Sequence, residues 1–164
     1  MIDRLVLAGL VAALGAVPAR AGGLEGKSYI IEMSSSQYSS GYADDLVPPL
    51  AAALAKSAMK PLKGPGADVA INVVTHSDVG QWISEGEGRQ WLYTVSITVG
   101  ISPGDYQIPV DGTPQFGVRA SLMTPNGDRE DEMACLIGLA AGQAIARYRP
   151  AGMIEIDGRA CLRK

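Results

Sequence analysis

The clearest pattern in the chain is a strict alternation of side chains over residues 91–101. One side of this stretch carries Trp91, Tyr93, Val95, Ile97, Val99 and Ile101. The other side carries Leu92, Thr94, Ser96, Thr98 and Gly100. A period of two is that of a β-strand whose two faces differ. The stretch therefore predicts a strand in a sheet with one apolar face and one largely polar face.

The same kind of pattern predicts three more strands, and spacings of three and four predict two helices. Strands are expected at residues 27–33, 67–76 and 116–123. A first helix is expected from Asp44 or Asp45 to about residue 59, because Asp can cap a first turn and leucines recur at steps of four. A second helix is expected between Asp128 and Pro150.

This order, β-α-β-β-β-α, predicts an α+β two-layer sandwich. We expect a sheet of about four mostly antiparallel strands with both helices on one face, followed by a disulfide-tethered C-terminal segment. Two courses are open for that segment: it returns over the outside of the second helix, or residues 153–156 add an edge strand. In element order alone, the layout resembles that of several small bacterial envelope proteins, including accessory subunits of outer-membrane assembly and transport.

The first residues predict export. Residues 5–17 are an almost unbroken apolar run, and Ala19-Arg20-Ala21 fits the small-x-small pattern that signal peptidase cleaves. The run is well short of the roughly 20 residues that span a bilayer. We therefore expect residues 1–21 to be a cleaved secretory signal peptide. Residues 22–164 are expected to be a single periplasmic or secreted domain without membrane insertion.

Charge and cysteine content narrow the function classes. The chain carries 17 acidic and 14 basic residues and no basic stretch, which argues against a nucleic-acid partner. In an oxidising compartment, Cys135 and Cys161 are expected to form a disulfide that closes a loop of about 25 residues. Two distant cysteines and a single histidine do not make a zinc site, so we expect no metal and no cofactor.

The only histidine, His76, stands directly before Ser77 and Asp78. These are the residue types of a catalytic triad, but adjacent residues cannot reach triad geometry. We therefore expect His76 to end a strand and either face solvent or cap a turn, and we assign no catalytic residue. A periplasmic hydrolase that combines His76 with acids from other loops remains an alternative.

The polar side of the predicted sheet is the main candidate for binding, because two helices on the apolar face would leave it open. Its candidate residues are Thr94, Ser96, Thr98 and Arg119, together with Trp82 and Tyr106 near strand ends. Our first hypothesis is a non-catalytic protein that binds another envelope protein, or a second copy of itself, through this face. A further alternative is a small inhibitor of a secreted enzyme that presents the long loop 102–115.

Overall fold

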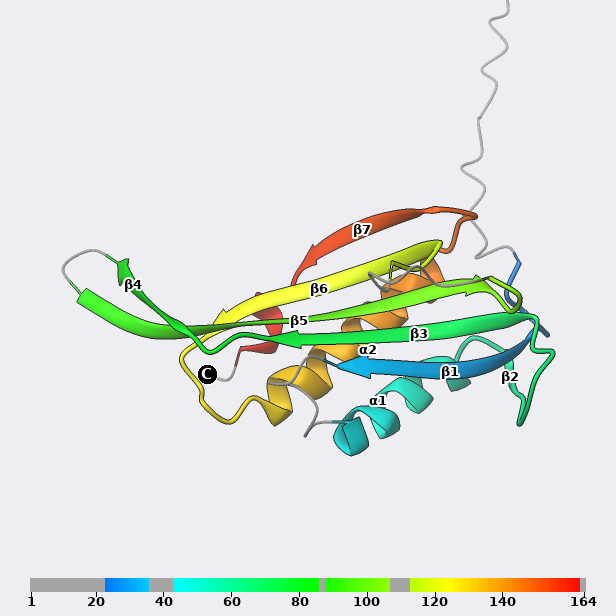
Figure 1. Cartoon of the computed structure of the whole chain (residues 1–164), viewed down its shortest axis with the longest axis horizontal. Helices are drawn as coiled ribbons and strands as arrows, with labels where there is room; N and C mark the ends of the chain where they lie inside the picture. Colours follow the sequence, from blue (N-terminus) through cyan, green and yellow to red (C-terminus); the bar gives the residue numbers. More distant parts are fainter. Residues whose placement is uncertain (1–22, 36–42, 86–87, 107–112, 163–164) are drawn as a thin grey trace, which may run out of the picture.

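The computed structural model describes residues 23–35, 43–85, 88–106 and 113–162, so the predicted signal peptide lies outside the described residues. The elements in chain order are β1 (Ser28–Ser35), α1 (Ala43–Ala55), β2 (Lys60–Pro61), β3 (Val69–Ser77), β4 (Gln81–Glu85), β5 (Gly88–Pro103), β6 (Phe116–Thr124), α2 (Glu130–Ala146), β7 (Gly152–Asp157) and the 3-10 helix η2 (Arg159–Cys161). Both α-helices lie on one side of the sheet (Figure 1). Within the described ranges, neither helix has the length and apolar character needed to cross a membrane.

The described strands form one mixed sheet of seven strands. Its order is β2-β1-β3-β5-β6-β7, and β4 pairs with β5 outside this path. β1 runs parallel to β2 and β3, and β6 runs parallel to β7, whereas β5 is antiparallel to β3, β4 and β6. The expectation of a four-stranded, mostly antiparallel sheet is therefore wrong, although the α+β class holds in broad terms.

The additional strands have no fully buried described position, so their side-chain pattern is weak. The sequence suggests residues 153–156 as an edge strand only as one of two arrangements, and residues 81–83 only as a continuation of the preceding strand. β2 has two residues, both exposed. β7 has no buried position, only half-buried and exposed ones. β4 pairs with the start of β5 beyond the helices, where its Trp82 stays 59 % exposed. Edge position and length, rather than side-chain pattern, define these strands.

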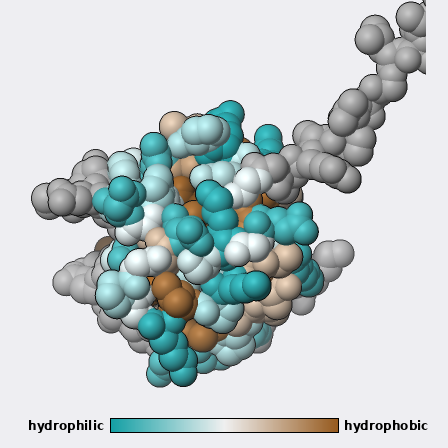
Figure 2. All heavy atoms as spheres, turned by 90° about the vertical axis from the view of Figure 1, so that its right-hand side faces the viewer, coloured by the Kyte–Doolittle hydropathy of each residue, from teal (hydrophilic) through white to brown (hydrophobic). Residues whose placement is uncertain are grey.

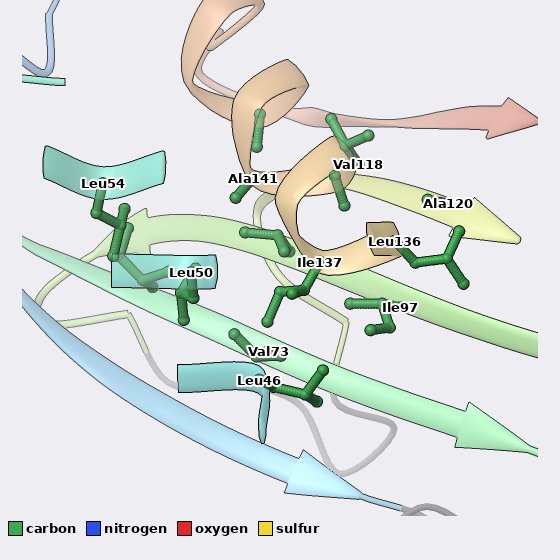
Figure 3. Close-up of a cluster of buried hydrophobic side chains, with 14 of the residues drawn as sticks. Leu46, Leu50, Leu54, Val73, Ile97, Val118, Ala120, Leu136, Ile137 and Ala141 are labelled. Carbon is green, nitrogen blue, oxygen red and sulfur yellow. The ribbon is translucent and has the colours of Figure 1, made fainter. Parts of the chain in front are cut away.

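The core lies between the helices and the middle of the sheet. Leu46, Leu50 and Leu54 of α1 recur at steps of four, as predicted, and each is at most 1 % exposed. Figure 3 shows them in one layer with Ile137 of α2 and Val73 of β3. Burying a leucine side chain contributes about 1.5–3 kcal/mol, so this stripe fixes which face of the sheet the helices cover.

The C-terminal segment forms an edge strand and then returns to the second helix, so it combines the two arrangements expected from the sequence. β7 adds a parallel edge strand beside β6, and η2 then reaches α2, where Cys161 is bonded to Cys135 with a Cα–Cα distance of 5.6 Å. The predicted disulfide is confirmed. The close approach occurs at Gly158, where a Cβ would overlap the Leu136 side chain and lie 2.8 Å from the Ser121 carbonyl oxygen.

Replacing both cysteines by serine is expected to lower the free energy of unfolding by about 3 kcal/mol, because the bond closes a loop of 26 residues in the unfolded chain. Denaturant unfolding with and without a reducing agent measures the effect. The serine variant serves as the control, since reductant should leave its midpoint unchanged. Equal midpoints for the native protein in both conditions would contradict the prediction.

Alanine substitutions at two glycines should shift stability in opposite directions. Gly158→Ala is expected to destabilise by about 1–3 kcal/mol, because the added methyl group meets Leu136 and the backbone of Ser121. Gly138→Ala in the middle of α2 has open space around it and should stabilise by up to about 1 kcal/mol through helix propensity. Thermal or denaturant unfolding compares the two, and a shift of the same sign in both would refute this packing argument.

Candidate functional site

The polar face of the sheet points away from the helices, but many of its side chains are already bonded to one another. Arg119 donates through Nε to Thr98 Oγ1 at 3.1 Å and pairs through Nη1 with Glu155 at 3.4 Å. Asn72 Nδ2 donates to Glu32 Oε2 at 2.9 Å. Asn72 and Thr98 are only 3 % and 4 % exposed. Asn72 and Thr98 are therefore covered, whereas Arg119 and Glu155 pair at the surface with side chains 48 % and 60 % exposed, so only part of the expected polar ladder is open.

Pro114 covers part of the outer face at Gly100 and Gly117. A Cβ at Gly100 would overlap the Pro114 ring, and one at Gly117 would lie 2.9 Å from it. Gly100 pairs with Asn72 on one side and with Gly117 on the other. Pro114 thus packs on the backbones of β5 and β6 at the outer face. Residues 107–112 of the loop 102–115 proposed for an inhibitor lie outside the described residues.

The open part of the outer face is a cavity of about 520 Å³ near the end of β7. Thr94 lines it, together with Ser121, Met123 and the C-terminal residues Glu155, Asp157 and Arg159. Arg159 donates to Asp157 through its side chain at 2.6 Å and its backbone N–H at 2.9 Å, and these bonds lower the pKa of the Asp157 carboxyl. The charged groups at the rim are therefore partly neutralised within the chain.

A second exposed region is the projecting hairpin formed by residues 81–85 of β4 and residues 88–93 of β5, which we call the arm. It extends beyond the end of the helix layer (Figure 1). Trp82 and Trp91 pack edge to face with ring centroids 5.4 Å apart, and Trp91 and Tyr93 with centroids 6.5 Å apart. At the base, the Arg129 guanidinium lies over the Tyr93 ring, 4.4 Å from its centroid. A ladder of aromatic rings thus leads from the start of α2 onto the arm.

The two tryptophans at the outer end of this aromatic ladder are exposed to solvent. Trp82 is 59 % exposed and Trp91 is 36 % exposed. Trp91 and Tyr93 share the side of β5 that carries the buried Val95 and Ile97, since alternate residues of a strand face the same way. The aromatic ladder therefore continues the apolar face of the sheet past the point where the helices cover it.

Asp78 holds the base of the arm in place. Its Oδ1 accepts hydrogen bonds from the backbone N–H groups of Thr94 at 2.8 Å and Gly80 at 2.9 Å. Burial alone would raise the pKa of Asp78, but these hydrogen bonds outweigh it and hold the pKa below its usual value of 3.8. Gly80 has φ +84°, and a side chain there would overlap Trp91, so glycine allows the ring to lie against the turn.

The structure does not bring the sequence-predicted residues into one site. Thr98 and Arg119 are bonded together, Ser96 is half-buried between its cross-strand partners His76 and Ser121, and Thr94 lines the cavity. Trp82 lies on the arm, whereas Tyr106 follows the opposite end of β5. The twelve residue steps from the partner of Trp82 to the end of β5 span about 40 Å.

The end of the molecule opposite the arm offers little apolar surface. Viewed from that end, Figure 2 shows mainly hydrophilic and intermediate residues with small separate hydrophobic areas. Tyr106 is half-buried in this region, and its backbone N–H donates to the Pro103 carbonyl at 2.9 Å. The arm is therefore the better candidate of the two aromatic positions.

His76 is exposed, as expected, and projects from the outer face opposite Ser96. Its neighbour Asp78 accepts hydrogen bonds from backbone amides at the base of the arm, so the Asp78 carboxylate is engaged in holding this structure. Within the described ranges, no group of three or more His, Cys, Asp or Glu side chains is arranged to hold a metal ion.

Sequence comparisons identify no relative: no family model matches the chain, and comparison with curated proteins finds no match. Comparison with solved structures finds similarity to the crystal structure of a minor lipoprotein from Acinetobacter baumannii. The two chains are 16 % identical, the alignment covers 79 % of this chain and 98 % of the other, and the TM-score is 0.48.

Asp78→Asn is expected to lower the free energy of unfolding at pH 7 by about 1–2 kcal/mol, because a neutral amide oxygen accepts the two backbone bonds less strongly. The pKa of Asp78 is lowered in the folded state, so its stabilisation is present above about pH 4 and is lost as the pH falls through the folded pKa. The difference between native protein and variant should therefore shrink below about pH 4.

Denaturant unfolding between pH 3 and pH 7 measures this difference, and Asp105→Asn in an exposed turn provides the control. A deficit of equal size in both variants, or one that grows as the pH falls, would rule out this role for Asp78.

Proposed function

We propose that this protein is a non-catalytic binding protein of the bacterial cell envelope and that it engages another envelope protein through the aromatic side of its arm. The observation that carries the proposal is the exposed pair Trp82 and Trp91 on an element that projects beyond the helices. Tryptophan is enriched among the residues that dominate protein–protein binding energy. An indole that is 59 % exposed gains most when a partner covers it.

The form of the arm favours a protein over a small molecule. Small ligands bind in concave cavities that enclose most of their surface. The Trp82–Trp91 pair instead lies on a two-stranded ribbon, and the cavity of about 520 Å³ is lined by Thr94 and Ser121 at the outer face rather than by these rings. A ribbon with exposed rings matches a groove or a flat surface on another protein.

Several residues support a non-catalytic role by what already engages them. Cys135 and Cys161 are bonded to each other, so neither is a free nucleophile. Asp78 accepts two backbone hydrogen bonds at the base of the arm. The only histidine, His76, lies exposed beside it. The cysteines and Asp78 thus stabilise the fold, and His76 is exposed to solvent.

Export to the periplasm, or beyond it, is part of the same proposal. The apolar run at residues 5–17 with the Ala19-Arg20-Ala21 pattern is typical of a signal peptide, and a disulfide persists in an oxidising compartment. The polar outer face is a weaker binding candidate than the arm, because Thr98 and Arg119 already bond to neighbours.

A photo-crosslinking amino acid at position 82 is expected to capture a discrete partner in envelope extracts. The matched control carries the same amino acid in place of Lys63, which is exposed in the turn after β2, far from the arm. A specific product from position 82 that is missing from position 63 supports the proposal. Recovery of the protein alone from position 82, or the same products from both positions, would overturn it.

Trp82→Ala should weaken binding to the captured partner by about 30-fold, the loss typical of an interface hot spot. Its thermal unfolding should stay close to that of the native protein because the side chain is mostly exposed. Unchanged affinity in this folded variant would place the binding surface elsewhere.

A further inference from the structure

We propose that the open edge of β1 binds an extended segment of a partner protein as an additional strand, and that this segment carries apolar side chains on one face and basic side chains on the other. β1 lies near the opposite side of the sheet from β7 and forms no part of the arm. The proposal therefore stands whether or not the arm binds a partner.

The backbone of β1 presents bonding groups to this edge. β2 pairs only with Ser28 and Tyr29, and the Leu62 N–H donates to the Tyr29 carbonyl at 2.8 Å. Successive residues of a strand direct their backbone groups to opposite sides, so Ile31 and Met33 direct theirs to the same side as Tyr29. Among the described residues, no strand pairs with β1 there beyond Tyr29. Such an edge is a template for strand addition.

An apolar strip lies beside this edge on the helix side of the sheet. Ile31 and Met33 pair with Ile71 and Val73, which are at most 1 % exposed, yet they are themselves 38 % and 37 % exposed. Figure 3 shows the leucines of α1 close to Val73 of β3, so β3 is covered more fully than its neighbour β1. An added strand with apolar side chains on this face would cover both residues.

Val47 of α1 extends the strip. It is 46 % exposed and lies about 100° around the helix from the buried Leu46. Ala53 and Lys56, on the other side of the leucine stripe, border a depression shared with α2. Val47 therefore faces the β1 side of the helix. Exposed apolar side chains therefore come from both β1 and α1 on the helix side of this edge.

The outer face of the unpaired part of β1, beyond Tyr29, carries a negative charge at Glu32, which defines the partner further. Glu32 lies on the outer side of β1, where it accepts a hydrogen bond from Asn72. The Glu32 carboxylate forms no ion pair with a described residue. Lysine or arginine on the outer face of an added strand would supply the missing cation.

A second copy of the chain fits the edge less well than such a partner. The two-fold pairing that sets Ile31 opposite Met33 of a second copy would bring the two Glu32 carboxylates directly opposite each other. Like charges at directly opposed positions destabilise a strand pair. A strand with a basic residue at that position removes the repulsion, so we assign the edge to a different protein.

The test uses a fluorescent peptide of eight residues that alternates valine with lysine, and a second peptide with glutamate in place of lysine. Fluorescence anisotropy with the full protein should show saturable binding of the lysine peptide and much weaker binding of the glutamate peptide. Hydrogen exchange should show new protection of the Ile31 and Met33 amides in the complex. Absence of binding, equal binding of the two peptides, or no protection at these amides would overturn the proposal.

Two variants of the edge sharpen the result. Met33→Lys places a positive charge in the apolar strip and should weaken binding of the lysine peptide about tenfold or more. Ile31→Pro removes an edge N–H without removing a bond to β3 and should act in the same way. Met123→Lys is the matched control, since Met123 is 38 % exposed but lies on the outer face of β6, and it should bind normally.

Trp82→Ala should also bind the lysine peptide normally, which separates this edge from the arm. Normal peptide binding by Met33→Lys and Ile31→Pro would refute the assignment to β1. A concentration-dependent dimer in analytical ultracentrifugation that Met33→Lys abolishes would show that a second copy occupies the edge instead.

Discussion

The two helices are too narrow to cover the whole apolar face of the sheet, and the exposed apolar residues of this protein follow from that difference in width. Two packed helices are about 20 Å wide, whereas six strands about 4.8 Å apart occupy about 29 Å. The helices bury the middle strands, with Val73 and Ile97 at most 1 % exposed. Ile31 at one side and Trp91 at one end remain partly uncovered. The proposed binding surfaces are the parts of one apolar face that the helix layer does not reach.

The sequence predicts well what is buried on one side and poorly what is not. Periodicity predicts α1 from its leucines at steps of four and β5 from its alternation. Both patterns are visible because burial selects apolar side chains at fixed periods. β2 is held by backbone bonds to β1, which any side chain permits, and β7 adds only the half-buried Ile154 and Ile156 to its backbone bonds with β6. The mixed sheet, and with it the open edge of β1, depends on these strands and could not be inferred from periodicity.

The candidate site shows the same division. The sequence predicts that Thr98 and Arg119 share a face, but only the structure shows that they bond to each other and that Pro114 covers the neighbouring backbone. Trp82 is a candidate in both analyses, yet its stacking on Trp91 requires a hairpin whose turn includes residues outside the described ranges. The contact of Arg129 with Tyr93 joins residues far apart in sequence and leaves no local signal.

β5 belongs to both the core and the arm, and this has a mechanical consequence. Its hydrogen bonds to β3 and β6 run perpendicular to the strand, so a pull along the arm would load many of them at once in shear. A sideways pull on β4 would instead open its few bonds to β5 one after another. The sheet would therefore resist a force along the arm and yield to a force that peels β4 away from β5. The force needed to separate these strands would depend on the direction of the pull.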